Sequence, residues 1–301
     1  MPLKTTSELV SPPALRPGDM VAICAPASPV ERDRLRRGVQ VLSERYRVRV
    51  SEGVLAADGY LAGDDDRRAD ELNRLLRDPD VRGIFPAQGG YGITRILDRL
   101  EADPLRNNPK AIVGFSEATA LLCWAYTTAG VRGIHGPMAA DLAERPRREQ
   151  QRLIDLLEGK EAMQPIPCCN VQGNTGAKPE TSGQGQPAPL EGKLLGGNLT
   201  LLSVLVGTPY QVPLDDALLF IEDIQKDPST IDRLLTHMHV AGTLQGVRAA
   251  LLGDLTQCED QSLPGPTAAE VVDERMESFG IPLLSGLPVG PARDQVWGVF
   301  L

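Results

Sequence analysis

The chain has 301 residues, of which 42% are hydrophobic, 24% are charged and 4% are aromatic, and its formal net charge is -9. This is an ordinary globular composition, long enough for two domains that each have a core. An acidic chain with few aromatic side chains is a poor candidate for nucleic-acid binding, which needs basic faces for phosphates and rings that stack on bases.

The sequence shows no apolar run as long as a membrane span and no apolar core of a signal peptide near residue 1. We therefore expect a cytoplasmic protein that does not bind membranes. The five cysteines lack CxxC spacing, and their odd number leaves at least one unpaired. Reduced thiols are the expectation. The cysteines are Cys24, Cys123, Cys168, Cys169 and Cys258.

The first 150 residues alternate short apolar runs with helical patterns. In the helix expected at 32–45, Leu35, Val39 and Leu42 recur at helical spacing. Strands that alternate with helices predict an α/β domain with a mainly parallel sheet flanked by helices. The expected strands are 19–26, 81–90, 110–116 and 131–137, and a second helix is expected at 67–80.

A change in composition separates this domain, residues 1–150, from a second one. Residues 164–192 are rich in Gly, Pro, Ser, Thr and Gln and have no helical period, so 151–192 is interpreted as an interdomain crossing. A smaller C-terminal α/β domain is expected over 193–301. Its pattern contains strands at 217–223 and 247–255 and helices at 230–242 and 268–280.

A lone serine stands where the apolar run at 111–114 changes to a helical pattern. Ser116 follows Gly114 and Phe115, and the stretch "EATALL" comes directly after it. A strand-to-helix turn would expose a nucleophile beside backbone N–H groups that have no partner in the helix. The pattern falls short of G-x-S-x-G because Ala118 fills its last position. Ser116 as a plain helix N-cap stays open as the alternative.

Two further stretches carry possible chemistry. "AQGGYG" at 87–92 is a Gly-rich turn too short for a dinucleotide fingerprint, but Gly-Gly allows a backbone N–H to approach a reacting carbonyl. Glu222 stands at the end of the apolar strand "ALLFIED". A carboxylate there is either a loop cap or the acid that orients a catalytic group.

The ordered set of motifs resembles the LD-carboxypeptidase family. These serine peptidases include muramoyl-tetrapeptide carboxypeptidases and microcin C self-immunity peptidases, and the resemblance runs from about residue 15 to about residue 290. It is carried by "VAICAPASPV", "QGGYGITRILDRL", "IVGFSEATALL", "LLGGNLTLLSVLVGTPY" and "LLFIEDIQKDPSTIDRLLTHM".

The resemblance implies a two-domain α/β protein, a homodimer, with an active site between the domains and a Ser-Glu-His triad. The nucleophile then falls on Ser116 and the triad acid on Glu222. The backbone N–H groups of Gly90 and Glu117 would bind the oxyanion. No cofactor is implied.

The same resemblance places substrate-binding residues on the Gly-rich turn, at Gln88, Gly89 and Tyr91. Gln88 stands where the family often has Arg. A positive charge that could hold an anionic substrate is therefore absent at this position.

The family's histidine lies in a stretch like P-V-G-H-G, where this chain has Pro291. Proline has no side-chain proton acceptor, so a substitute base would have to be His135 or His237. His237 and His239 point to different sides of one expected helix, which makes a metal site a poor interpretation.

The sequence therefore predicts an LD-carboxypeptidase-like serine hydrolase with an incomplete or rearranged triad. It would act on a peptide or amide bond near a free C-terminus. The alternative is a disabled or repurposed member of the same fold, which binds a peptide-like ligand or carries out non-hydrolytic acyl transfer.

Overall fold

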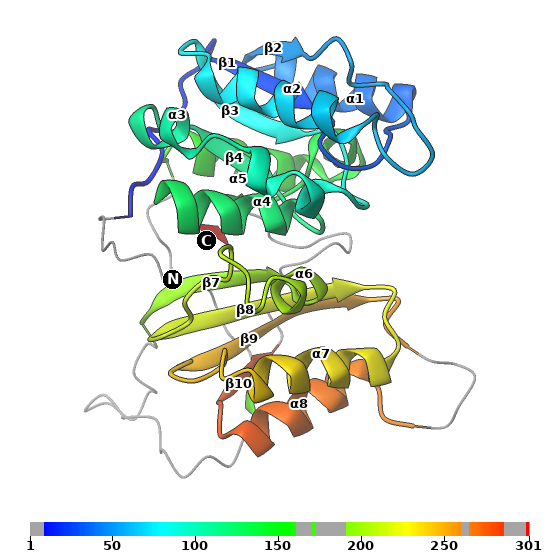
Figure 1. Ribbon diagram of the computed structural model, residues 1–301, viewed down its shortest axis with the longest axis vertical. Helices are drawn as coiled ribbons and strands as arrows, with labels where there is room; N and C mark the ends of the chain where they lie inside the picture. The colour runs from blue at the N-terminus through cyan, green and yellow to red at the C-terminus, as the bar shows by residue number, and fades with distance from the viewer. Residues whose placement is uncertain (1–8, 161–169, 173–190, 260–264, 286–298, 301) are drawn as a thin grey trace. The chain divides into compact units, whose positions relative to one another are not determined.

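The computed structural model describes residues 9–160, 170–172, 191–259, 265–285 and 299–300 (Figure 1). The chain divides into two compact units. The first comprises Met1–Ala162, Thr208–Val212 and Val296–Leu301, and the second comprises Met163–Gly207 and Pro213–Gln295. No helix in the described ranges is long and apolar enough to cross a membrane.

The first unit is built on a six-stranded sheet with the order β11-β5-β4-β3-β1-β2. All neighbouring strands are parallel except β11, which runs antiparallel to β5. The predicted mainly parallel sheet is thus confirmed. Its strands are β1 Met20–Cys24, β2 Arg47–Val50, β3 Val81–Pro86, β4 Ala111–Gly114, β5 Ile134–His135 and β11 Val299–Phe300.

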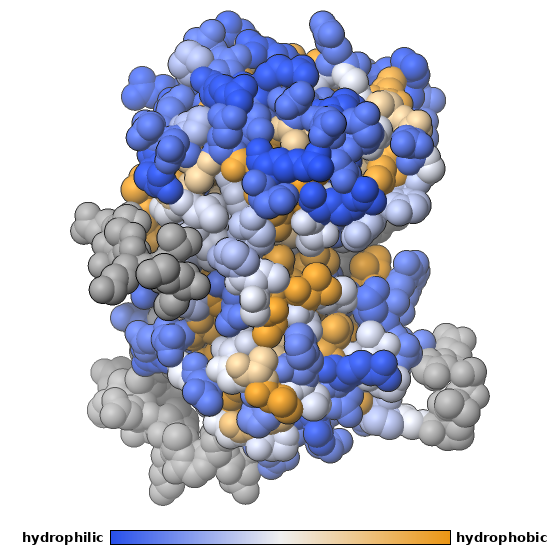
Figure 2. Space-filling view, in the orientation of Figure 1, coloured by the Kyte–Doolittle hydropathy of each residue, from blue (hydrophilic) through white to orange (hydrophobic). Residues whose placement is uncertain are grey.

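Five α-helices flank this sheet (Figure 1). Helix α1 buries Leu35 and Leu42, and its N-cap Glu31 accepts hydrogen bonds from the next turn. The helices are α1 Arg32–Ser43, α2 Asp65–Arg77, α3 Ala102–Asn107, α4 Ala118–Trp124 and α5 Arg147–Leu157. A π-helical turn, Ala125–Ala129, follows α4. The outer face of this unit is largely hydrophilic in Figure 2.

The second unit has a five-stranded sheet with the order β6-β10-β9-β8-β7, parallel except at β6. Helices α7 and α8 pack side by side below it in Figure 1. The elements are β6 Asn170–Gln172, β7 Lys193–Asn198, α6 Leu199–Val204, β8 Ala217–Ile224, α7 Pro228–Val240, β9 Ala249–Thr256, α8 Ala268–Phe279 and β10 Leu283–Ser285.

The predicted crossing is only partly described. Residues 170–172 of it form the edge strand β6, while 161–169 and 173–190 lie outside the described residues. Cys168 and Cys169 fall there too. Cys24, Cys123 and Cys258 are buried free thiols.

Gly38 offers a test of how α1 packs in the first unit. A Cβ at Gly38 would lie 1.7 Å from the backbone oxygen of Ala139, in the 3₁₀ segment Ala139–Glu144. Gly-to-Ala normally stabilises a helix by about 1 kcal/mol. Here we expect Gly38→Ala to lower the free energy of unfolding by about 1–3 kcal/mol, because backbone must move. Urea unfolding measures the change.

The control for this experiment is Gln40→Ala, at an exposed position of the same helix. It should change stability by less than about 0.5 kcal/mol. A stabilised Gly38→Ala protein would contradict the close approach of α1 to Ala139.

Candidate active site

Ser116 lies on the turn that joins β4 to α4, as the sequence predicts. Its φ is 54°, a left-handed conformation that non-glycine residues rarely adopt. The turn is tight, because the backbone N–H groups of Ala118 and Thr119 bond back to Phe115 and Ser116 at 3.0 and 2.9 Å. A side chain at Gly114 would meet the Cβ of Ala118 at 2.5 Å, so glycine is required where the strand ends.

The alternative interpretation of Ser116 as a helix N-cap is wrong. The N-cap of α4 is Glu117, and no side chain caps this end. The Ser116 hydroxyl makes no hydrogen bond within the described part of the chain, and the residue is half-buried. The serine therefore occupies a strained backbone position without the usual structural reason for a serine there.

The Gly-rich loop after β3 contacts this serine. Strands β3 and β4 are parallel neighbours, paired at Ile84 and Ile112, so their carboxyl ends reach the same edge of the sheet. A Cβ added to Gly89 would lie 3.4 Å from both Cβ and Oγ of Ser116. The backbone of the loop at residue 89 therefore lies next to Ser116.

Gly90 is fixed by contacts on both sides. Its φ is +105°, and a Cβ there would lie 2.2 Å from Ser28 Oγ. The Ser28 N–H donates to the Gly89 oxygen at 3.2 Å, and Ser28 Oγ accepts the N–H of Tyr91 at 3.1 Å. Among the described residues, the N–H groups of Gly90 and Glu117 have no hydrogen-bond acceptor. Both are thus available to a bound oxygen.

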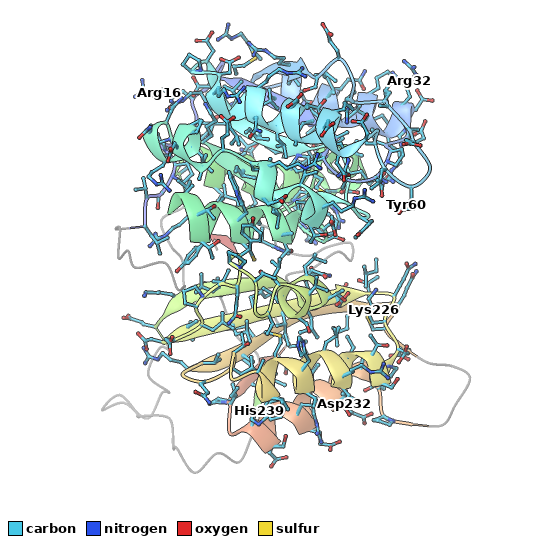
Figure 3. The ribbon with its side chains drawn as sticks, in the orientation of Figure 1. Arg16, Arg32, Tyr60, Lys226, Asp232 and His239 are labelled. Atoms are coloured by element: carbon cyan, nitrogen blue, oxygen red, sulfur yellow. The ribbon has the colours of Figure 1, made fainter. Side chains whose placement is uncertain are left out.

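Gln88 and Tyr91, the other expected substrate-binding residues, lie on the same loop. The Gln88 amide donates to the Pro29 oxygen at 3.1 Å. Tyr91 is 46% exposed, and its ring centroid lies 5.9 Å from that of Tyr60, which is labelled in Figure 3. Their role in binding substrate stays a prediction.

His135 lies on β5, paired with Gly114 at the end of β4. The ring is fully buried and makes an edge contact with Phe115, with centroids 6.4 Å apart. Burial lowers the pKa of His135 to about 3. A ring this hard to protonate is a poor general base at neutral pH, which argues against His135 as a substitute.

In the second unit, Glu222 lies near the end of β8 and is 1% exposed. It pairs in register with Asn198, the last residue of β7. Burial and, to a smaller degree, the neighbouring carboxylate of Asp223 raise the pKa of Glu222 to about 8, while the nearby amide of Asn198 lowers it. The group is therefore mostly protonated at neutral pH.

Asp223 forms a network that sequence reasoning missed. Its carboxylate accepts hydrogen bonds from the Thr200 N–H at 2.9 Å, the Thr200 hydroxyl at 2.7 Å and the Asn198 amide at 3.2 Å. These bonds tie the start of α6 to the end of β8, beside Glu222. The adjacent acidic pair "ED" in the sequence was the available signal.

His237 lies on the exposed side of α7. Its Nδ1 is 2.9 Å from the Ser203 hydroxyl on α6. His239 stacks on Phe279 of α8, with centroids 4.0 Å apart. Within the described ranges, no three His, Cys, Asp or Glu side chains are grouped to hold a metal ion.

Comparisons with known proteins identify the family of this chain. The pattern of the LD-carboxypeptidase N-terminal domain matches residues 21–136, and that of the C-terminal domain matches 191–299. A Synechocystis sp. protein named as a carboxypeptidase is 32% identical over 284 residues, which cover 93% of this chain and 89% of that protein. The chain belongs to the LD-carboxypeptidase family.

Two more members show how the similarity extends. The microcin C7 self-immunity protein MccF of Escherichia coli is 29% identical over 285 residues, covering 87% of this chain and 82% of MccF. The crystal structure of muramoyltetrapeptide carboxypeptidase from Oxalobacter formigenes superposes with a TM-score of 0.75 at 25% identity, covering 93% of this chain and 92% of that one. Pro291, where the family histidine is expected, lies outside the described residues.

The strain at Ser116 can be measured by comparing two variants that both remove the hydroxyl. A left-handed backbone costs an L-residue about 1–2 kcal/mol, which glycine avoids. We expect Ser116→Gly to be about 1 kcal/mol more stable than Ser116→Ala. At exposed Gln40 in α1, the order should reverse, with Gly less stable than Ala by about 1 kcal/mol. The same order at both sites would contradict the left-handed turn.

Glu222 should make stability depend on pH with a defined sign. Its pKa is about 8 in the folded protein and near the ordinary glutamate value of 4.5 when the chain is unfolded. Between these values the unfolded state releases the proton first, so stability falls as pH rises from about 5 to 8, by up to about 1.4 kcal/mol per unit. Glu222→Gln should lose this part of the slope. An unchanged slope in chemical unfolding at several pH values would contradict the buried, protonated carboxyl.

Proposed function

We propose that this protein is a serine-type LD-carboxypeptidase-like hydrolase that attacks a peptide or amide bond near a free C-terminus. The observation that carries the proposal is the turn at Ser116. A half-buried hydroxyl on a left-handed backbone contacts a Gly-Gly loop, and two backbone N–H groups nearby have no acceptor within the described chain. This arrangement suits a nucleophile with an oxyanion site.

In this proposal, Ser116 Oγ attacks the substrate carbonyl carbon. The carbonyl oxygen gains negative charge and accepts hydrogen bonds from the N–H groups of Gly90 and Glu117. Collapse of the tetrahedral intermediate breaks the C–N bond, and the amine leaves with the proton that Ser116 released. Water then attacks the acyl-enzyme, gives the free acid and returns a proton to Ser116 Oγ. Glu222 serves as the triad acid, and Gln88, Gly89 and Tyr91 contact the substrate.

The substrate class follows from the relatives. One solved relative is a muramoyltetrapeptide carboxypeptidase and another relative is a microcin C7 self-immunity protein. We therefore propose a small murein-type peptide or a peptide-antibiotic type amide as substrate. We further propose a cytoplasmic homodimer that uses no cofactor.

Proton transfer is the weak step of this mechanism. Pro291 stands at the family's histidine position, and His135 is buried with a pKa of about 3. The groups that set the pKa of Glu222 in the described chain are Asp223, Asp254 and Asn198, none of which is cationic. A glutamate that orients an imidazolium is expected to be ionised, because the positive ring lowers its pKa. Slow hydrolysis is the expected consequence.

Pro291 also favours a second function. A member of this fold without a base could bind a peptide-like ligand, or could form an acyl-enzyme that an amine rather than water resolves. The oxyanion site and substrate contacts would serve this function equally well. Labelling of Ser116 without hydrolysis would indicate acyl transfer, and ligand binding without labelling would indicate a binding protein.

The test pairs the wild type with Pro291→His on an LD-tetrapeptide and on a peptide amide. Loss of a triad member typically costs about 10⁴–10⁶ in turnover, so we expect a gain of at least about 100-fold in the variant. A fluorophosphonate probe should label Ser116, and Ser116→Ala should abolish both labelling and hydrolysis.

Other outcomes separate the alternatives. Full wild-type activity that disappears in His135→Ala or His237→Ala would show that the base has moved. Ligand binding without labelling, in both the wild type and Pro291→His, would favour the binding protein.

A further inference from the structure

The loop that carries Gly90 is held from two sides at Gly92. The Gly92 N–H donates to Glu117 Oε1 at 2.9 Å, and the Gly92 oxygen accepts a hydrogen bond from Arg68 Nη1 at 2.7 Å. The φ of Gly92 is +125°, and a Cβ there would meet Arg68 Nη1 and Leu61 Cδ2, each at 2.7 Å. The conformation therefore requires glycine, and both polar atoms of this peptide are fixed by charged side chains.

The Glu117 carboxylate bonds more of the loop than Gly92. Oε1 also accepts the Ile93 N–H at 2.8 Å and lies 3.5 Å from the Thr94 nitrogen. Glu117 is 2% exposed. Removing its acceptor would leave these donors buried without a partner, which is costly.

Arg68 fixes the second segment that contacts Gly90. Its side chain is fully buried, and Nη1 also donates to the Pro26 oxygen at 2.6 Å. Pro26 begins the loop that carries Ser28, whose hydroxyl would collide with any side chain at residue 90. An ion pair with Asp65 orients the guanidinium. Arg68 thus joins the loop that carries Ser28 to the loop that carries Gly90, through the oxygens of Pro26 and Gly92.

We propose that the Glu117 side chain is a positioning residue for the oxyanion site, tying the loop that carries the Gly90 N–H to the turn that carries Ser116. Through its backbone, the same residue supplies the second N–H donor. Glu117 therefore fixes the spacing between the two donors. Arg68 holds the same loop through its hydrogen bond to the Gly92 oxygen. The proposal rests on the proposed function, because Gly90 and Glu117 must be the oxyanion donors.

The position of Glu117 in the chain explains why this tie matters. Glu117 follows Ser116 directly in the chain. A shift of its carboxylate would therefore also shift the turn that carries Ser116. A displacement of about 1 Å in a positioning contact can cost on the order of 100-fold in rate. Gly90 makes no hydrogen bond through its own N–H in the described structure, so the placement of that N–H depends on its neighbours.

The experiment compares Glu117→Gln and Glu117→Met in the full-length protein. Methionine removes the acceptor at similar length, whereas glutamine keeps an oxygen for the three N–H groups. The first measurement is amide hydrogen exchange over residues 88–96. The second is the rate of Ser116 acylation by a fluorophosphonate probe, with the affinity for a non-reactive peptide measured in parallel.

Glu158 provides the matched control. Its side chain is 3% exposed in the same unit and pairs with Arg45 and Lys160, and within the described chain it makes no hydrogen bond or ion pair with the loop at 88–94. Glu158→Met should lower stability through the loss of these ion pairs while leaving acylation and loop exchange unchanged. Thermal unfolding of both methionine variants separates general destabilisation from a local effect.

We expect Glu117→Met to speed exchange at residues 92 and 93 by about 10- to 100-fold and to lower the acylation rate on the order of 100-fold. Peptide affinity should change by less than the acylation rate, because the oxyanion forms only in the transition state. Glu117→Gln should restore most of the protection and fall between the wild type and Glu117→Met in acylation.

Unchanged exchange at 92–94 in Glu117→Met would overturn the tie itself. Faster exchange with unchanged acylation would overturn the positioning role while leaving the proposed function intact. Equal absence of labelling in the wild type and Ser116→Ala would overturn the proposed function and the positioning role together, and the exchange data would still decide whether Glu117 holds the loop.

Discussion

The parallel pairing of β3 with β4 is the constraint on which the rest of the first unit depends. Because both strands end at the same edge of the sheet, the loop after β3 and the turn after β4 must share that edge. The backbone at Gly89 lies next to Ser116, and only glycine at 92 permits the hydrogen bonds of the loop to Glu117 and Arg68. The need for glycine at residue 92 thus follows from where strand order places this loop.

The strained conformation of Ser116 persists because its surroundings leave no alternative. All seven residues of α4 are buried, so the helix cannot shift to relax the turn. Gly114 before the turn and the carboxylate of Glu117 after it fix both ends. A left-handed residue costs about 1–2 kcal/mol, which this packing offsets. In this conformation the Ser116 hydroxyl does not cap the helix. As an N-cap, its oxygen would accept a hydrogen bond from a backbone N–H of the first turn.

Sequence patterns predicted the features that depend on residues close together in the chain. The strand–helix alternation and the turn at Ser116 follow from apolar periodicity and from a small residue at a boundary. The roles of Glu117 and Asp223 could not be read this way. Their hydrogen bonds reach Gly92 and Thr200, and such contacts depend on loop paths that no periodicity encodes. The same limit applies to β11, a pair of residues that joins the first sheet from the far end of the chain.

In the proposed mechanism, oxyanion stabilisation and proton transfer depend on separate groups. The proposed donors are the backbone N–H groups of Gly90 and Glu117, which do not depend on a titrating base. Oxyanion stabilisation and binding alone can supply about 10³–10⁴ over the reaction in water. The titratable groups are poorly suited to proton transfer at neutral pH. Burial makes His135 hard to protonate and Glu222 hard to ionise. In the proposed mechanism, a protonated base beside Glu222 would also favour the ionised form of that carboxyl and lower its pKa. The proposed proton transfer and the ionisation of Glu222 therefore depend on the same base.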